Sequence, residues 1–366
     1  MKFNRDCKSF LGNYACEVMT SENLKDCEGC KFYEPYSKKI LIIKLGAMGD
    51  VLRTTPILAA LKKKYRSDIH ITWLVKEESL PLLQKNPHID KILIYNSENL
   101  LRLKHEKFNI LINLDIETAA TLISNEVNAG KKFGYYFHKD SHPAFYNKAA
   151  EYYLNRVFSN YVNKNNRKTY QEMMFEIAEL PYEKETIILN NIDYKYAENF
   201  LKKNNLKKED KILGINIGSS GRWISKAWHQ DKIIELIKKL KNYKIILLAG
   251  PEEKELLPEL VSKLRSQNIK VITNNPDNTV PEFISIINIC STVITGDSLA
   301  LHISTALKKK TIALFFCTPP WEIEDYNLVK KIISPLLEDY FYSDQYHEDL
   351  VKSISVEQVL KEIQND

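Results

Sequence analysis

Hydrophobic residues along the chain occur in two alternating patterns, short continuous runs and longer stretches with helical spacing. The first run covers Ile40–Ile43 and is typical of a strand that is buried on both faces in a parallel sheet. From Asp50 onward, apolar residues recur at helical spacing as far as Leu61. Further strand-like runs lie at 68–75, 91–95 and 109–115. Strands and helices that alternate at this spacing predict right-handed βαβ units and a parallel sheet.

A second series of the same kind follows the segment 182–194, which we interpret as a linker with one strand. Its apolar runs begin near Lys211, Lys244 and Ser291. At 366 residues with 44% hydrophobic content, the chain is long enough to bury two ordinary cores. We therefore predict an α/β protein with two parallel-sheet domains, at 39–182 and 183–350. The remaining 351–366 is predicted to contain an amphipathic helix that packs back on the first domain.

The charge balance and the N-terminus limit the classes of partner. The net charge of +5 comes from 52 basic and 47 acidic residues, and this excess is too mild to predict nucleic-acid binding. The chain starts without an apolar signal segment, and no run approaches the roughly 18 apolar residues of a membrane span. We expect a cytoplasmic protein. Lysine clusters such as Lys62–Lys64 are either solvated helix ends or a peripheral contact with the anionic inner face of a membrane.

The first 38 residues form a polar, irregular extension that holds four of the six cysteines. These are Cys7, Cys16, Cys27 and Cys30. The CxxC spacing of the last two lets two thiolates bind one metal from a tight turn, and the other two would complete a four-sulfur site. We therefore predict a zinc or iron site in 1–38. Its role would be structural, because four thiolates leave no open coordination position for chemistry. Free or redox-active thiols are the alternative.

A glycine turn joins the first strand to the first helix. Gly46 and Gly49 allow backbone approaches that a side chain would block. Asp50 lies at or near the helix N-terminus, where N–H groups without helical partners favour an anion, so it is either a helix cap or a functional carboxylate. Asp115 ends the strand at 109–115, at the sheet edge where open α/β sheets bind ligands, and is a second candidate.

Small residues also follow the first strand of the second series, at Gly218, Ser219 and Ser220. Their N–H groups, together with the bases Arg222 and Lys226, would suit a diphosphate. The alternative is an ordinary turn with solvated bases. After the next strand, Glu253 occupies the edge where a nucleotide ribose would lie, or it simply complements a helix dipole.

The last candidates follow the strand at 292–295. Gly296 and Asp297 form a turn there, and the helix that comes next presents its N–H groups to an anion. Ser298 and His302 lie on the same side of this helix by the i, i+4 relation. His302 is therefore either a core residue or a ligand contact.

Two stretches resemble glycosyltransferase family 9, the ADP-heptose:lipopolysaccharide heptosyltransferases and their relatives. They are ILIIKLGAMGDVLRTTPIL, from Ile40, and STVITGDSLALHISTALKKKTIALFF, from Ser291. The second is similar to the family's DTGPMHLAAALG signature and is the more specific. The resemblance covers about Lys39 to Glu324 and implies the GT-B architecture, in which two Rossmann-like domains face a cleft. The first domain would bind the acceptor and the second the nucleotide sugar.

The resemblance also implies roles for individual residues. By position, Asp50 is the catalytic base, Lys226 contacts the phosphates of the donor, and Glu253 binds the ribose hydroxyls. The places of the C-terminal signature are taken by Asp297, Ser298 and His302. Leu299 departs from the family at a position where glycine is usual, which puts the closest approach of the backbone to the phosphates in question. Arg222 matches no family residue.

These residues would support glycosyl transfer without a metal. Asp50 would take the proton of an acceptor hydroxyl, which is worth about 10²–10⁴-fold in rate. Lys226 and helix N–H groups would stabilise the departing nucleoside diphosphate. Attack and departure on opposite faces invert the anomeric centre, and the sequence has no DxD pair for a metal-bound diphosphate. We therefore expect an inverting, metal-independent transferase that needs no cofactor for catalysis.

The resemblance favours ADP-heptose as the donor and a lipopolysaccharide core as the acceptor. Another lipid-linked glycan, another surface polymer and a protein hydroxyl are the alternative acceptors. Two other classes fit the alternating pattern: an NAD-type Rossmann oxidoreductase and a non-catalytic nucleotide-sugar-binding protein. The first is weakened because GAMGD lacks the GxGxxG spacing, and the second would bind an ADP-sugar without turnover.

Overall fold

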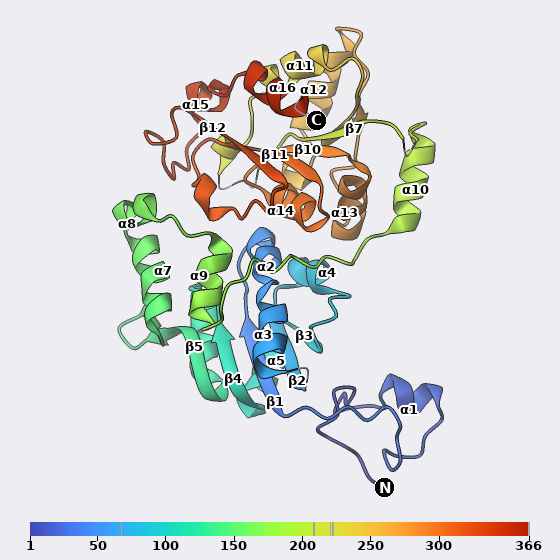
Figure 1. Cartoon of the computed structure of the whole chain (residues 1–366), viewed down its shortest axis with the longest axis vertical. Coiled ribbons are helices and arrows are strands. Elements are labelled where there is room, and N and C mark those ends of the chain that lie inside the picture. Colours follow the sequence, from blue (N-terminus) through green and yellow to red (C-terminus); the bar gives the residue numbers. More distant parts are fainter. Residues whose placement is uncertain (67, 208, 220, 222, 365–366) are drawn as a thin grey trace. The chain divides into compact units, whose positions relative to one another are not determined.

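The computed structural model describes residues 1–66, 68–207, 209–219, 221 and 223–364, and the chain divides into two compact units (Figure 1). The first consists of Met1–Asn166 and Gln171–Glu185, and the second of Arg167–Tyr170 and Thr186–Asp366. Each unit is built around one largely parallel sheet flanked by helices. The predicted fold class, an α/β protein with two parallel-sheet domains, is confirmed.

The first unit contains a six-stranded sheet in the order β3-β2-β1-β4-β5-β6. Neighbouring strands among the first five are parallel, and β6 runs antiparallel to β5. The strands are β1 (Lys38–Ile43), β2 (Ile69–Val75), β3 (Lys91–Ile94), β4 (Lys107–Asn113), β5 (Asn128–His138) and β6 (His142–Phe145). The helices are α2 (Met48–Thr54), α3 (Ile57–Tyr65), η1 (Glu77–Ser79), α4 (Leu80–Leu83), α5 (Ser97–His105), α6 (Thr118–Glu126), α7 (Lys148–Phe158), α8 (Asn160–Asn165) and α9 (Tyr170–Ile177).

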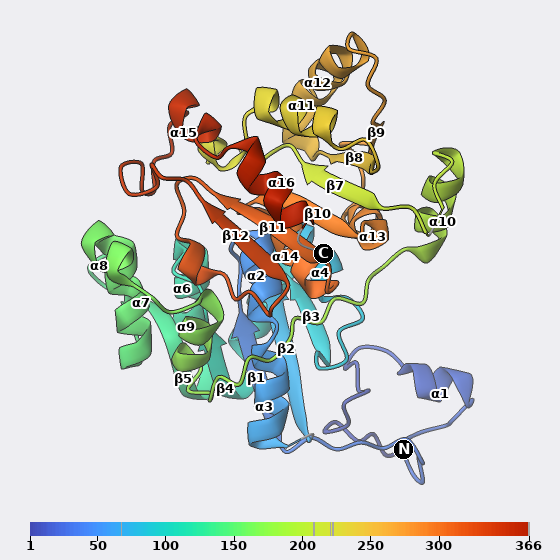
Figure 2. The same cartoon turned by 45° about the horizontal axis from the view of Figure 1, so that its top comes forward.

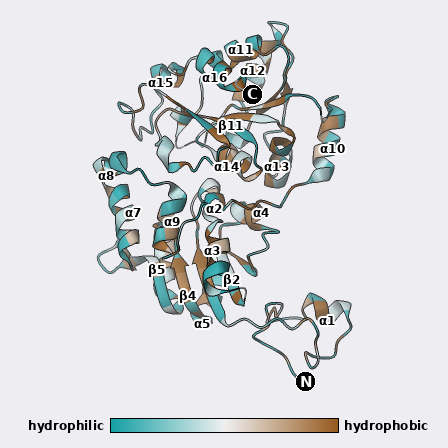
Figure 3. Ribbon diagram, in the orientation of Figure 1, coloured by the Kyte–Doolittle hydropathy of each residue, from teal (hydrophilic) through white to brown (hydrophobic). Residues whose placement is uncertain are grey.

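Continuous apolar runs of the sequence become the buried central strands of this sheet. Ile40–Ile43 in β1 have no exposed surface, and β2 is buried along its whole length. On one face, side chains of α5 and α6 pack against those of β1, β2 and β4. Figure 3 shows the resulting contrast between hydrophobic strands and helices with hydrophilic outer faces. The strands predicted from 40–43, 68–75, 91–95 and 109–115 are all present. The strand predicted within the linker 182–194 is wrong, because the backbone there is irregular up to α10.

The second unit contains a six-stranded, fully parallel sheet in the order β12-β11-β10-β7-β8-β9 (Figure 2). The strands are β7 (Ile212–Asn216), β8 (Lys244–Leu248), β9 (Ile272–Thr273), β10 (Thr292–Gly296), β11 (Lys310–Phe315) and β12 (Val329–Ile333). The helices are α10 (Tyr194–Lys203), η2 (Ile224–Lys226), α11 (Gln230–Lys239), η3 (Pro251–Glu253), α12 (Leu256–Arg265), α13 (Val280–Ile289), α14 (Leu299–Ala306), η4 (Pro320–Glu322), α15 (Glu348–Lys352) and α16 (Val356–Gln364). Among the described residues, none of the helices combines the length and hydrophobicity that crossing a bilayer would require.

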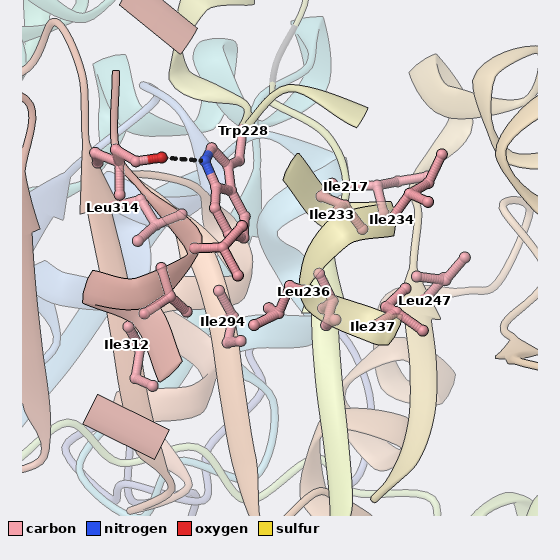
Figure 4. Packing of buried hydrophobic residues seen from close by; sticks show 14 of the residues in the cluster. Ile217, Trp228, Ile233, Ile234, Leu236, Ile237, Leu247, Ile294, Ile312 and Leu314 are labelled. Atoms are coloured by element: carbon pink, nitrogen blue, oxygen red, sulfur yellow. Dashed lines mark hydrogen bonds between the residues drawn. The ribbon is translucent and has the colours of Figure 1, made fainter. Parts of the chain in front are cut away.

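The C-terminal helix packs on the second unit, so the prediction that it returns to the first domain is wrong. Val356, Val359 and Ile363 of α16 join the hydrophobic cluster of the second sheet. Just before the helix, the indole nitrogen of Trp228 donates a hydrogen bond to the Ile354 carbonyl at 3.2 Å (Figure 4). The amphipathic pattern predicts an apolar face that needs burial, but it does not specify which sheet supplies the partner.

The segment before β1 differs from the rest of the chain because it has little regular secondary structure and no buried residue. Its one regular element is the short helix α1 (Glu17–Ser21), and no residue of 1–38 is buried. An isolated β-bridge pairs Cys7 with Pro35, and the Ser37 N–H donates to the Asp68 carbonyl at 2.6 Å. The segment is therefore tied to the end of the sheet where β1 begins.

Candidate active-site residues at the carboxyl ends of the strands

Each sheet has a point where the strand order reverses, and open α/β sheets bind ligands beside such points. In the first unit, β1 has β2 on one side and β4 on the other; in the second, β7 lies between β8 and β10. Because these strands are parallel, the loops that follow them leave the sheet at one edge. Most of the predicted site residues lie in these loops or in the first turn beyond them.

Asp50 lies in the first turn of α2, shortly after β1. Its Oδ1 accepts two hydrogen bonds from the Arg53 guanidinium, at 3.0 Å from Nε and 2.7 Å from a terminal nitrogen. The Asp50 side chain is 32% exposed and that of Arg53 is 12% exposed, so the carboxylate is reachable while the guanidinium restricts its orientation. Ala47 occupies the N-cap position. The alternative that Asp50 is only a helix cap is therefore not supported.

A buried carboxylate holds the loop between β1 and α2. Asp115 Oδ2 accepts hydrogen bonds from the N–H groups of Leu45, at 2.9 Å, and Gly46, at 2.6 Å. Lys44 Nζ lies 3.5 Å from the same oxygen. A Cβ on Gly46 would come within 3.1 Å of that oxygen, so glycine lets the loop close over the carboxylate. Asp115 thus positions the loop that leads to Asp50.

The second glycine of the predicted turn belongs to the helix. α2 begins at Met48, which makes Gly49 its second residue, and the prediction that Gly49 shapes the turn is wrong. The turn is already complete at Gly46 because Asp115 binds the backbone there. The helix therefore starts earlier than the apolar spacing indicated.

Lys226 and Asp297 form an ion pair across the reversal point of the second sheet. Lys226 Nζ is 2.9 Å from Asp297 Oδ2, and the two side chains are 15% and 17% exposed. His302 Nε2 lies 4.0 Å from the other carboxylate oxygen of Asp297, and its side chain is nearly buried. The lysine nitrogen is also 5.8 Å from the centre of the Trp223 ring. The structure therefore brings a cation and an imidazole to one carboxylate.

Gly296 permits the close packing on which this ion pair depends. A Cβ at this position would lie 2.1 Å from the Lys226 carbonyl oxygen, far closer than real atoms approach. Any side chain there would push the Lys226 segment away from the end of β10. Of the predicted turn glycines in this unit, Gly296 is the one that brings the two charged residues together.

Ser298 connects the ends of β7 and β10 at the start of α14. Its hydroxyl accepts a hydrogen bond from the Asn216 amide at 3.3 Å and lies 2.9 Å from the Thr295 hydroxyl. Ser298 is the N-cap residue of α14 by position, but its side chain makes no cap bond to the helix. The N-terminus of α14 keeps the partial positive charge that favours an anion.

Glu253 lies against the loop that follows β7. Its carboxylate accepts the Gly250 N–H at 2.8 Å, and a Cβ on Gly218 would overlap it at 1.9 Å. Burial raises the pKa of Glu253 above its ordinary value, while backbone hydrogen bonds from Gly250 and Ser219 oppose the rise. Glu253 therefore joins the loops after β7 and β8, and the predicted ribose contact stays a prediction.

The predicted diphosphate loop is described only in part. The Ser219 hydroxyl donates to the Trp223 carbonyl at 2.8 Å, which shapes the loop internally. Ser220 and Arg222 lie outside the described residues. The predicted contacts of a diphosphate with the Ser220 N–H group and with the positive charge of Arg222 therefore rest on the sequence alone.

Three residues that sequence analysis did not select contact the candidate site residues at the carboxyl ends of the strands. They are Lys44, Arg53 and Asn216. The pairing of Arg53 with Asp50 has a readable signal, the i, i+3 spacing on one helix. The contacts of Lys44 with Asp115 and of Asn216 with Ser298 have none, because these partners are far away in the sequence.

Among the described residues, one group of His, Cys, Asp and Glu side chains brings three ligand atoms within 4.8 Å of one another. It consists of His138, Asp140 and His142 at the turn between β5 and β6. His138 Nδ1 lies 3.2 Å from an Asp140 oxygen, and the two imidazoles stack with centroids 4.9 Å apart. These contacts account for the group without an ion. The predicted cysteine ligands lie in the segment before β1.

Known proteins share both the sequence pattern and the fold. The sequence model of glycosyltransferase family 9 (heptosyltransferase) matches residues 100–346. Lipopolysaccharide heptosyltransferase 1 of Campylobacter coli is 26% identical over 317 residues, 81% of this chain and 89% of that protein. The solved glycosyltransferase family 9 structure from Veillonella parvula has a TM-score of 0.69 at 20% identity, covering 90% of this chain and 97% of that one. Escherichia coli ADP-heptose LPS heptosyltransferase II has a TM-score of 0.67 at 18% identity, with coverage of 89% and 97%. The solved structures support the GT-B fold.

Proposed function

Because this chain belongs to glycosyltransferase family 9, we propose that it transfers heptose from ADP-heptose to a hydroxyl of a lipopolysaccharide core. Glycosyltransferase activity follows from the family and from the relatives that match most of the chain. The donor and acceptor come from the names of those relatives, a lipopolysaccharide heptosyltransferase and an ADP-heptose LPS heptosyltransferase.

The observation that carries the proposal is the Lys226–Asp297 ion pair at the reversal point of the second sheet. A nucleoside diphosphate bound there would offer Lys226 a stronger anionic partner than one carboxylate. The positive N-terminal end of α14 begins directly after Asp297. Fixed positive charge at this point would stabilise the negative charge that develops on the departing ADP, and such stabilisation is usually a large part of catalysis.

We assign the general base to Asp50 in the first unit. An acceptor hydroxyl attacking the anomeric carbon must lose its proton, and a positioned carboxylate would take it. Arg53 fixes one carboxylate oxygen, which limits the orientations in which Asp50 would meet a substrate. Asp115 and Lys44 act indirectly, because they hold the loop from which α2 starts.

The stereochemistry and the absence of a catalytic metal are part of the same proposal. Attack by the acceptor hydroxyl on the face of the sugar opposite to the departing diphosphate would invert the anomeric centre in a single displacement. Lys226 and backbone N–H groups would neutralise the diphosphate, and the sequence offers no DxD pair for a cation. We propose that Glu253 contacts the ribose and that His302 orients Asp297.

We also propose that the enzyme works at the cytoplasmic face of the inner membrane, where a lipid-linked core would be presented. The lysine cluster Lys62–Lys64 is the feature that supports this membrane contact. Lys62 pairs with Asp90 and Lys63 with Glu183, so their charge is partly compensated within the chain. Flotation of the protein with anionic vesicles tests the membrane contact separately from activity.

The proposed reaction is tested with purified protein, ADP-heptose and a heptose-free core lipid, and the product is followed by mass spectrometry. We expect one heptose per acceptor by mass, and the NMR spectrum of the product should show the anomeric configuration opposite to that of the donor. Competition by ADP but not by UDP or GDP would support the donor nucleotide. A preference for UDP- or GDP-sugars would contradict the heptose assignment, and ADP-heptose binding without turnover would favour a non-catalytic sensor.

A further inference from the structure

The segment 1–38 is ordered without a hydrophobic core. None of its residues is buried, and its helix α1 has only five residues. Large apolar side chains such as Phe3, Tyr14 and Phe32 are 46%, 69% and 56% exposed. Small structures that cannot bury enough apolar surface need covalent or metal cross-links. Some cross-link must therefore hold this segment.

Tight turns surround the cysteines of the segment. The Cys30 N–H donates to the Cys27 carbonyl at 3.3 Å, and the Tyr33 N–H donates to the Cys30 carbonyl at 3.3 Å. Cys7 also lies between two such turns, because its N–H binds Asn4 and its carbonyl binds Phe10. Turns of this kind present side chains of residues close in sequence toward a common point, as metal-binding loops require.

All four N-terminal cysteines line one cavity of about 720 Å³. They are free thiols, and each is partly exposed. Aromatic side chains complete the wall of this cavity: Phe3, Phe10, Tyr14, Phe32 and Tyr33. A cavity lined by four thiols has the donor set of a thiolate-bound metal centre.

The spacing of the sulfur atoms favours a cluster over a single ion. Four thiolates on one zinc lie about 3.8 Å apart, as follows from Zn–S bonds of about 2.3 Å in a tetrahedron. Within 1–38, all of which is described, no three cysteine sulfurs lie within 4.8 Å of one another. A four-iron cluster spreads its cysteines more widely, because each iron takes its own thiolate.

We propose that Cys7, Cys16, Cys27 and Cys30 bind an iron–sulfur cluster of the [4Fe–4S] type, which holds the segment 1–38 together. The four thiols lose their protons on binding, and each thiolate occupies one iron. No coordination position is left open, so the cluster is structural or passes electrons and does not bind the sugar.

The cluster lies at the opposite end of β1 from the loop that leads to Asp50. Tyr36 connects the segment to β2: its N–H donates to the Asp6 carbonyl at 2.9 Å, and its ring centroid lies 5.1 Å from that of His70. Loss of the cluster should therefore loosen 1–38 and leave the sheet in place. Heptose transfer is expected to stay within about twofold of the wild-type rate.

The test is anaerobic purification of the full chain from iron-replete cells, followed by iron, sulfide and zinc analysis and visible absorption and EPR spectra after reduction. We expect about four irons and four sulfides per chain, both lost in Cys27→Ser/Cys30→Ser. The control Cys290→Ala, at a buried cysteine of the second unit, should keep them. Limited proteolysis should cut within 1–38 only in the double variant.

One zinc per chain without sulfide would overturn the cluster assignment. So would metal-free protein in which these cysteines form disulfides or remain as free thiols. Metal and sulfide contents are read independently of turnover, so failure of this proposal and failure of the proposed transfer reaction can be told apart.

Discussion

Both sheets carry a lysine–aspartate pair at the point where the strand order reverses, but the pairs differ in burial and in what they bind. Lys44 and Asp115 follow β1 and β4; their side chains are 5% and 6% exposed, and Asp115 also binds two backbone N–H groups. Lys226 and Asp297 follow β7 and β10, and their side chains are 15% and 17% exposed. The first pair is part of the loop's structure. The second pair lies where a ligand could exchange with the carboxylate.

This difference accounts for the separate tasks proposed for the two units. In the first unit the buried lysine is committed to the loop, and the reachable charge is Asp50, a carboxylate. In the second unit the reachable charge includes a cation. A general base is therefore assigned to one sheet and diphosphate binding to the other, although the strand orders around β1 and β7 correspond.

The largest effect is expected when Asp50 is replaced. Asp50→Asn removes the proton acceptor while keeping the shape, so kcat should fall about 10²–10⁴-fold. The measurement is steady-state heptose transfer, with circular dichroism to verify folding. Asp339→Asn, at an exposed aspartate of the second unit, is the matched control. A wild-type rate in a folded Asp50→Asn variant would exclude the assigned base.

The buried pair of the first sheet should affect stability next most strongly. Asp115→Asn leaves Lys44 buried beside a neutral partner, and breaking such a pair costs about 3–5 kcal/mol. Urea unfolding should show a lower midpoint for the first unit, together with reduced kcat because the Asp50 loop is less well held. Adding Lys44→Met should recover part of the lost stability. A change below about 0.5 kcal/mol in the single variant would show that the pair does not hold the loop.

Lys226→Met tests the pair of the second sheet. The variant loses the cation for the leaving group, and kcat/KM for ADP-heptose should fall on the order of 10²-fold. The control is Lys232→Met, which removes a lysine from α11 that pairs with Glu235. Equal losses in the two variants would indicate a general effect of charge instead of a local contact.

The smallest effect concerns the pH dependence associated with Glu253. Its folded-state pKa is raised by burial, so the folded protein holds this proton more tightly than the unfolded chain does. The stability that comes from this group is present below the ordinary carboxyl pKa and is lost as pH rises through the folded pKa. Glu253→Gln should therefore flatten the decline of stability that sets in as pH rises above the ordinary carboxyl pKa. Thermal unfolding of the wild type and of Glu253→Gln at several pH values measures this decline. Parallel curves of stability against pH for the two proteins would contradict the raised pKa of Glu253.

Sequence patterns predicted the strands that lead to the candidate site residues, and the ends of those strands, because both depend on local features. Ile40–Ile43 could be assigned to a buried strand from four apolar residues, and Asp297 could be placed at a strand end from the glycine before it. Lys44 could not be assigned, since its partner Asp115 lies beyond the end of another strand, β4. The helix α16 shows the same limit: its apolar face was predictable, but the sheet that covers it was not.

Glycines show where sequence reasoning about the site succeeds and where it fails. Gly46 and Gly296 were selected as turn residues, and in each case an added Cβ would meet a neighbouring segment. Gly49 was selected by the same rule and lies in a helix. Gly134 was not selected, yet its φ is +86° and a Cβ would lie 1.7 Å from the Asn113 carbonyl oxygen. A glycine in a sequence indicates room for close approach, but only the fold shows what approaches.

The most direct test of the division between the two sheets is calorimetric titration of ADP into wild-type protein, Asp50→Asn and Lys226→Met. The account predicts that Asp50→Asn binds ADP as tightly as wild type and that Lys226→Met binds it at least about tenfold more weakly, or about 1.4 kcal/mol. Unchanged ADP affinity in Lys226→Met, or a comparable loss in Asp50→Asn, would contradict it.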